Sequence, residues 1–129
     1  MLCYTKIMKK QKLSQKKRVE DTKRSPCPVA NLLDIIGDKW TMLIIRDLFM
    51  GKKTYSEFEN SYEGIRTNIL AERLKRLQTA GIIEKSPYQE KPVRYQYTLT
   101  EKGKALGPVL KAMKNWGLKY IPDTYVPER

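Results

Sequence analysis

The chain is organised around the stretch Ile65-Arg-Thr-Asn-Ile-Leu-Ala-Glu-Arg-Leu-Lys-Arg-Leu-Gln78. At about 100° per residue, Leu70, Leu74 and Leu77 fall on one face, which predicts an amphipathic helix with a narrow apolar seam. The opposite face is polar and partly basic, with Asn68, Glu72 and Lys75. Any solvated helix with an apolar underside shows the same pattern, so the neighbouring elements decide what it means.

A shorter helix is predicted just before this stretch. Thr54-Tyr-Ser-Glu57 is a capping box, in which the Thr hydroxyl accepts from the amide of Glu57 and the carboxylate reaches back. The short helix runs through Phe58, and residues 60–64 form a turn that ends in Gly64. Two helices joined in this way match a helix-turn-helix, whose second helix protrudes. Its outer face can therefore stay polar and basic without disturbing the core.

Two strand signals follow Gly81, where the long helix is expected to end. Ile82–Lys85 is a short strand pattern, and Tyr95–Leu99 alternates between apolar and polar residues. Ser86–Pro92 is expected to be a proline-bounded turn, so residues from about 82 to 99 form a β-hairpin. A helix-turn-helix followed at once by a basic hairpin is typical of a winged helix. The predicted class is mainly α with a small β-hairpin wing (α+β), a winged helix-turn-helix.

Two more helices are predicted on the N-terminal side. Pro28 suits a first helical turn, and a helix that ends at Gly37 is indicated by the spacing of Val29, Leu32, Leu33 and Ile36. Asp38 is the expected N-cap of a second helix, Lys39–Met50, which stops at Gly51. Its expected buried residues are Trp40, Leu43, Ile44 and Leu48.

The C-terminal region predicts a last helical segment with an unpartnered apolar face. Thr100 is its expected cap, and Pro108 is expected to kink it or divide it in two. Four apolar residues recur at helical spacing: Val109, Met113, Trp116 and Tyr120. A second copy of the chain is the simplest partner, which predicts a two-fold dimer through the terminal helices. The alternative is a helix that folds back on its own core.

The charge of the chain points to a polyanionic partner. The 129 residues carry a net charge of +12, of which residues 1–25 contribute +7 and residues 26–129 contribute +5. We divide the chain into a basic flexible arm (1–24), one domain (25–121) and a C-terminal tail (122–129). The arm is either a DNA-contacting segment or a tail without a role. Nucleic acid is the commonest partner of such a basic chain.

Other function classes are disfavoured by what the sequence lacks. It has no histidine and only two cysteines, Cys3 and Cys27, so neither a His-based catalytic pair nor a zinc site is expected. The seven glycines are scattered singly, without a phosphate-binding loop. We therefore expect no enzyme activity, no cofactor and no metal. The most apolar run, Met42–Ile45, is too short to cross a bilayer, and without a signal peptide a cytoplasmic location is expected.

Several motifs together resemble the HxlR family of bacterial winged-helix transcription regulators, which are MarR-like. They are Cys27-Pro-Val, Gly37-Asp-Lys-Trp40, the run Thr67–Leu77, the run Val93–Gly103 and Trp116-Gly. The resemblance covers residues from about 25 to 121 and implies a homodimer that binds operator DNA. It also implies that some members sense oxidants, quinones or aldehydes through a cysteine near the N-terminus. Cys27 stands at that position of the pattern.

The mode of DNA binding follows from the chemistry of the grooves. An α-helix fits the major groove, where Asn pairs with adenine and small side chains contact thymine methyls. Thr67, Asn68 and Ala71 are therefore the expected base readers. The expected phosphate contacts come from the start of the short helix and from the long helix: Lys52, Lys53, Arg66 and Arg73. Thr54 is expected to bind DNA beside them, Lys75 to lie deeper in the groove or on phosphate, and Lys91 and Arg94 of the wing to contact the backbone or the minor groove. Glu72 either accepts from cytosine or pairs with Arg76.

Cys27 has two interpretations. A thiol at a helix N-terminus beside Arg24 favours thiolate chemistry and hence a switch, and a small buried cysteine that fills a gap is the alternative. Two rival functions also stay open. One is a MarR-like regulator gated by a small molecule between dimer helices, in a pocket lined by Trp116, Tyr120 and Trp40. The other is a winged helix that contacts protein or RNA.

Overall fold

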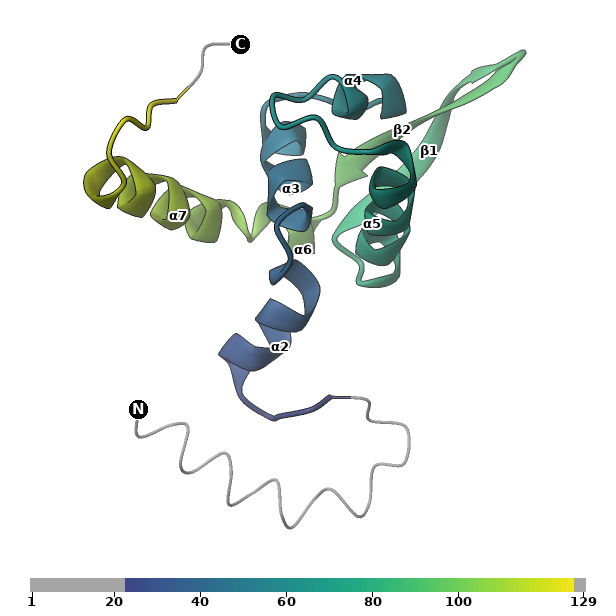
Figure 1. The fold of residues 1–129 in the computed structure, drawn as a ribbon. Coiled ribbons are helices and arrows are strands. Elements are labelled where there is room, and N and C mark those ends of the chain that lie inside the picture. The colour runs from purple at the N-terminus through teal and green to yellow at the C-terminus, as the bar shows by residue number, and fades with distance from the viewer. Residues whose placement is uncertain (1–22, 127–129) are drawn as a thin grey trace, which may run out of the picture. The chain divides into compact units, whose positions relative to one another are not determined.

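The computed structural model describes residues 23–126 and shows a mainly helical chain with one antiparallel hairpin (Figure 1). This is the predicted class. The elements are α2 (Pro28–Ile36), α3 (Thr41–Phe49), α4 (Tyr55–Glu59), α5 (Thr67–Thr79), β1 (Ile83–Glu90), β2 (Val93–Leu99), α6 (Glu101–Lys104) and α7 (Gly107–Tyr120). The predicted arm, except for its last two residues, and Cys3 lie outside the described residues. No helix in the described range is long and apolar enough to cross a bilayer.

Helix α2 belongs to a separate N-terminal unit, which ends at Asp38. Cys27 is its N-cap residue and Pro28 occupies the first turn, as the sequence predicts. The side chain of Asn31 donates to the carbonyl oxygens of Ser25 (2.7 Å) and Cys27 (2.8 Å), which fastens the entry to the helix. The helix ends at Ile36, and at its C-cap residue, Gly37, an added Cβ would lie 2.4 Å from the Leu33 carbonyl oxygen.

Helix α3 differs from its prediction at the N-terminus. The helix begins at Thr41 with Trp40 as N-cap residue, so the prediction that Asp38 caps it is wrong. Trp40 and Leu43 are only partly buried, whereas Ile44 and Leu48 are buried as expected. The core also takes in Thr41 and Ile45, both fully buried. This burial is wider than one amphipathic face, because α3 contacts both β2 and α7.

The predicted helix-turn-helix is present as α4, the turn and α5. Both halves of the capping box at Thr54 and Glu57 are formed, and Arg66 is the N-cap residue of α5 without a side-chain cap bond. The leucine seam of α5 lies in the core as predicted: Leu70, Leu74 and Leu77 are at most 1% exposed. Phe58 of α4 and Ile65 before α5 are buried with it.

The hairpin is longer, and its turn tighter, than the sequence suggested. Strand β1 runs through the segment expected to be a turn, and only Lys91-Pro92 separates it from β2. Pro87 pairs with Tyr95 in the register, and a bulge follows between Pro87 and Gln89. The expectation of a turn over Ser86–Pro92 fails because each strand of a two-stranded sheet is an edge strand, where a proline is tolerated. The ribbon formed by the two strands extends beyond the helices (Figure 1).

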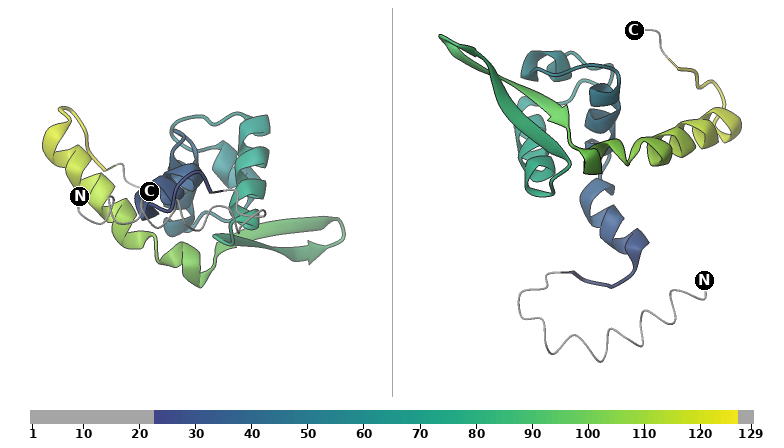
Figure 2. Two further views of the ribbon diagram at one scale, coloured as in Figure 1. Left: turned by 90° about the horizontal axis from the view of Figure 1, so that it is seen from below. Right: turned by 180° about the vertical axis from the view of Figure 1, so that it is seen from behind.

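The C-terminal segment is divided at the predicted place. The Thr100 hydroxyl accepts from the amide of Gly103, which starts α6, and Pro108 lies in the first turn of α7. Within α7, all of which the structure describes, no side chain is buried, so the helix does not fold back on its own core. It leaves α3 and α6 on the side away from the hairpin (Figures 1 and 2). Its exposed apolar residues are Met113, Trp116, Leu118 and Tyr120.

Candidate nucleic-acid interface

The outer face of α5 carries the residues expected to read bases. Thr67, Asn68 and Ala71 are exposed, on the side of the helix away from the buried leucines. The Thr67 hydroxyl donates to a carboxylate oxygen of Glu59 (2.9 Å), so its own oxygen remains the acceptor it offers outward. Lys75 is exposed one turn beyond Ala71. The face therefore carries short, mostly polar side chains at its N-terminal end and a basic side chain farther along.

Two arginines of this stretch, Arg66 and Arg73, were expected to contact phosphate, and their surroundings differ. Arg66 is exposed at the N-cap, but the side chain of Arg73 is only 19% exposed and donates to Glu72. Glu72 also accepts from Arg76 Nη2 at 2.9 Å. Hydrogen bonds from Arg73, and then from Arg76, hold the pKa of Glu72 below its ordinary value. Of the two roles left open for Glu72, the pairing with Arg76 is the one that the structure contains.

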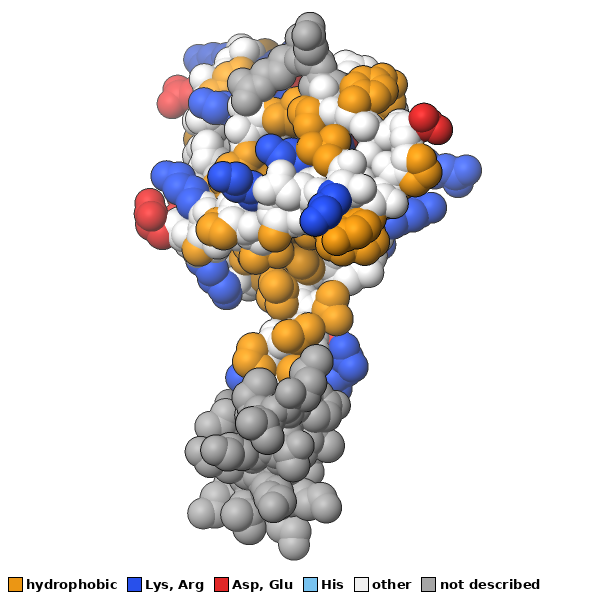
Figure 3. All heavy atoms as spheres, turned by 90° about the vertical axis from the view of Figure 1, so that its left-hand side faces the viewer, with side chains coloured by type: hydrophobic (Ala, Val, Ile, Leu, Met, Phe, Trp, Pro, Cys, Tyr) orange, Lys and Arg blue, Asp and Glu red, His pale blue; other side chains and the backbone are white. Residues whose placement is uncertain are grey.

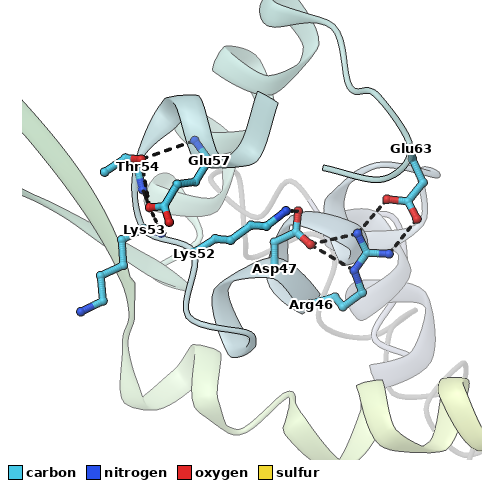
Figure 4. Close-up of polar contacts among 7 residues, drawn as sticks. All are labelled: Arg46, Asp47, Lys52, Lys53, Thr54, Glu57 and Glu63. Carbon is cyan, nitrogen blue, oxygen red and sulfur yellow. Dashed lines mark hydrogen bonds and ion pairs between the residues drawn. The ribbon is translucent and has the colours of Figure 1, made fainter. Parts of the chain in front are cut away.

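The loop before α4 places its two lysines in different environments. Lys52 points toward Asp47, with 3.8 Å between Nζ and Oδ2, whereas Lys53 is exposed and points away (Figure 4). The Thr54 hydroxyl is engaged with Glu57, whose Oε1 accepts from the amides of Lys53 (3.1 Å) and Thr54 (3.0 Å). These bonds lower the pKa of Glu57. Lys53 is therefore the cation of this loop that is available to a partner.

The wing carries the predicted Lys91 and Arg94, both exposed, at its turn and at the start of β2. It also carries residues that the sequence analysis missed. The Lys85 ammonium lies over the Tyr95 ring, 4.3 Å from its centroid, and Tyr88 is exposed beside the bulge. Once Ser86–Glu90 is known to be a strand, the register places Lys85 and Tyr95 on one face. In the sequence, only the alternating spacing of Tyr95 and Tyr97 indicated that Tyr95 could face a residue of the other strand such as Lys85.

Tyr55 is a second residue that the sequence analysis missed. Its hydroxyl donates to the backbone carbonyl oxygen of Thr67 at 2.7 Å and so joins α4 to the first turn of α5. Partial burial, and then the charge of Glu59, raise the pKa of Tyr55. Spacing along the chain gives no hint of this contact, because it depends on the angle between the two helices.

The residues predicted for the dimer interface lie on α7 and are largely exposed. Trp116 is 60% and Met113 50% exposed, and Tyr120 packs against Trp116 with ring centroids 5.2 Å apart. Val109 is half-buried near the start of the helix. From the side of Figure 1 on which α7 lies, hydrophobic side chains are visible at the surface between Lys and Arg side chains (Figure 3).

Cys27 lies in the other unit of the chain. It is a free thiol, only 9% exposed, and its amide donates to the Ser25 hydroxyl at 3.0 Å. Arg24, expected beside the thiol, forms an ion pair with Asp34 at 2.6 Å. The burial agrees with the gap-filling interpretation and leaves the sensor interpretation to a chemical test.

An open depression of about 410 Å³ lies along the second half of α5, lined by Glu72, Lys75, Arg76, Thr79 and Ala80. It does not involve Trp116, Tyr120 or Trp40, the residues expected to line a ligand pocket. Within residues 23–126, no three His, Cys, Asp or Glu side chains gather closely enough to hold a metal ion.

Comparison with known proteins gives a consistent answer. Residues 35–125 match the family model of the HxlR-like helix-turn-helix. The HTH-type transcriptional regulator YdeP of Bacillus subtilis is 42% identical over 94 residues, which is 73% of each chain. The regulator YvaP of the same organism is 35% identical over 101 residues, covering 78% of this chain and 94% of that one.

Solved structures agree in fold as well as in sequence. PA1607 superposes with a TM-score of 0.73 and 43% identity, covering 83% of this chain and 75% of that chain. The redox regulator HypR, in its oxidised form, gives 0.68 and 34% identity over 78% of this chain and 100% of its own. YdeP and YvaP are named HTH-type transcriptional regulators, and transcription regulation is not an enzyme class. This chain belongs to the HxlR-like helix-turn-helix family of transcriptional regulators.

Proposed function

We propose that this regulator is a homodimer that binds a palindromic operator in duplex DNA. Helix α5 enters the major groove, and the wing formed by β1 and β2 lies on the backbone or in the minor groove. The observation that carries the proposal is the division of α5 into a buried leucine seam and an exposed face with Thr67, Asn68 and Ala71. Such a helix packs its apolar side against the core and leaves its polar side free to contact base edges.

The phosphate contacts in this proposal come mainly from exposed cations. They surround the reading face from the N-cap, the loop before α4, the helix and the wing: Arg66, Lys53, Lys75, Lys91 and Arg94. The cations of Lys52 and Arg73 already contact a carboxylate, so we expect these two residues to contribute less to phosphate binding. Binding through several phosphates makes affinity fall steeply with salt.

The apolar face of α7 supports a second protomer. A helix with no buried residue but with exposed Met113, Trp116 and Tyr120 has not found its partner within the described chain. A second copy of α7 provides a matching surface across a two-fold axis. Two reading helices related by that axis favour half-sites about 10 bp apart, or a multiple of that spacing.

The test is selection of bound sequences from random duplexes, followed by gel shift at several salt concentrations. We expect enrichment of one palindrome, and no comparable binding to an RNA duplex of the same sequence. Recovery of unrelated duplexes at equal affinity, or a preference for RNA, contradicts the proposal and favours the protein- or RNA-contact alternative. Sedimentation of the same complex reports whether two chains bind each site.

We further propose that modification of Cys27 switches operator binding. The supporting observations are a free thiol at the entry to α2 and the likeness to HypR, a redox regulator. A thiol oxidant such as diamide is expected to change operator affinity in the wild type and in Cys3→Ser, but not in Cys27→Ser. If the oxidant leaves wild-type affinity unchanged, Cys27 is a gap-filling residue.

A further inference from the structure

Asp47 is a nearly buried carboxylate at the C-terminal end of α3, and its side chain is 4% exposed. Its Oδ1 accepts from Arg46 Nε at 3.1 Å and Nη2 at 2.9 Å, and its Oδ2 lies 3.8 Å from Lys52 Nζ (Figure 4). Its backbone carbonyl oxygen also accepts from the amide of Lys52 at 3.0 Å. A buried charge of this kind persists only where such partners compensate it.

Arg46 extends the cluster to the helix-turn-helix. Its Nη1 and Nη2 donate to Glu63 Oε2 (2.8 Å) and Oε1 (2.7 Å), a two-pronged contact with fixed geometry (Figure 4). Glu63 lies in the turn between α4 and α5, four residues before Thr67. The Arg46 hydrogen bond holds the pKa of Glu63 below its ordinary value, so Glu63 is an anion at neutral pH.

The cluster therefore touches both approaches to the helix-turn-helix. Lys52 lies two residues before Thr54, the N-cap residue of α4, and Glu63 lies four residues before Thr67, where α5 begins. Two planar groups, a guanidinium and a carboxylate, fix orientation as well as distance. The turn is thus attached to α3 by a contact with little rotational freedom.

We infer that Arg46 and Asp47 are positioning residues. They fix the position of the α4–turn–α5 unit on α3, and this position determines the selectivity of the unit for an operator. The inference rests on the proposed function. It predicts an effect of removing Glu63 that is opposite to the effect expected from the repulsion between its negative charge and DNA. Glu63 is an anion close to α5 and repels phosphate, so its removal by itself tightens binding to every duplex. As the anchor of the turn, its removal instead weakens binding to the selected palindrome alone.

The experiment uses the full chain and the variant Glu63→Gln. Affinity is measured for the palindrome recovered from random duplexes and for a scrambled duplex at the same salt concentration. We expect the palindrome to bind about five- to tenfold more weakly, since a charged hydrogen-bond pair is lost, while scrambled DNA binds as before or slightly more tightly. Glu101→Gln is the matched control: Glu101 is a carboxylate of α6, outside the reading helix and the wing, and its side chain is 94% exposed. It should leave the ratio of the two affinities unchanged.

Arg46→Lys provides a second variant that keeps the positive charge. A lysine cannot hold both oxygens of Glu63 and also Asp47, so it too should lower the affinity ratio. The double variant Arg46→Lys/Glu63→Gln should be no worse than the more severe single variant, because one contact is being removed. Circular dichroism checks that each variant is folded.

The possible outcomes separate the two claims. If wild type selects a palindrome but Glu63→Gln tightens or leaves unchanged its affinity for both duplexes, the positioning role is wrong and the proposed function stands. Additive losses in the double variant also count against it. If wild type selects no duplex, both the proposed function and the inference are wrong.

Discussion

At the scale of single residues, side chains of one chemical type have different roles in this protein. Lys52 and Lys53 are neighbours, but one pairs with a buried carboxylate and the other is exposed. Arg66 and Arg73 differ in the same way. The number of Lys and Arg residues in the sequence therefore overstates the number of cations available to a polyanion. The exposed and unengaged side chains form a smaller set, which the structure identifies.

Asn68 and Lys53 give a paired prediction at this scale. Asn68→Ala removes a base-reading amide and should relax preference at particular base pairs by roughly 1–3 kcal/mol. Lys53→Ala removes a phosphate contact and should weaken all duplexes alike, with a shallower dependence of affinity on salt. Gel shifts on the selected palindrome and its single-base variants distinguish the two. Equal losses on specific and scrambled DNA for both variants would exclude Asn68 as a base reader.

Gly103 is predicted to tolerate no side chain. A Cβ at this position would lie 2.2 Å from the Ile82 carbonyl oxygen and 2.9 Å from Leu99 Cδ2. Gly103→Ala should therefore lower the free energy of unfolding by about 1–3 kcal/mol, measured by urea denaturation at fixed protein concentration.

Gly117 is the matched control, since a Cβ there meets no atom within 4 Å. Gly117→Ala removes a flexible residue from helix α7 and should stabilise the fold by up to about 1 kcal/mol. A loss for Gly117→Ala as large as that for Gly103→Ala would mean that close packing is not what makes Gly103 necessary.

At the scale of elements, α7 gives the clearest expectation. Trp116→Lys places a charge on its apolar face and should weaken dimerisation about tenfold or more, since buried Trp residues dominate many interfaces. Sedimentation measures the dimer, and operator affinity should fall with it. Lys111→Gln, on another face of the same helix, should leave the dimer intact. A wild-type chain that stays monomeric at high concentration contradicts this assignment of α7.

The hairpin shows how an element can be correctly located and wrongly described. Its two arms and its place after α5 follow from β-branched and alternating residues. The position of its turn does not follow from the sequence, because Pro87 and Pro92 are both residues that could interrupt a strand. Pairing of Pro87 with Tyr95 turns the proposed loop into strand. Tyr97 then donates from its amide to the Lys53 carbonyl oxygen at 2.8 Å, which ties the base of the wing to the loop before α4.

At the scale of the whole molecule, stability should depend on acid titration. Glu57 and Glu63 have folded pKa values below their ordinary value of 4.5. The unfolded chain therefore binds more protons in this range, so these groups stabilise the fold above about pH 4.5 and lose that effect as pH falls through the folded pKa values. Melting temperatures measured from pH 7 to pH 3 should decrease, and Glu63→Gln should flatten the decrease. A melting temperature that rises on acidification would contradict the assignment.

The same scale explains which site residues were predictable. The outer face of α5 and the basic wing are local patterns, and Thr67, Asn68, Ala71 and Arg94 are exposed as the patterns suggest. The contacts that hold this face in place are not local. Tyr55 meets Thr67, and Arg46 meets Glu63, across twelve and seventeen positions of the chain.

The sequence by itself determined the order of the elements, the capping box at Thr54, the leucine seam and the division of the last helix at Pro108. These features depend on hydrogen bonds and periodicities within a few residues, which act wherever the segment lies. Only the tertiary structure decided that Asp47 is buried, that Arg46 is paired with Glu63, and that β1 continues through Pro87 beside Tyr95. These outcomes depend on which distant groups the folded chain brings within contact distance, and no local pattern encodes that distance.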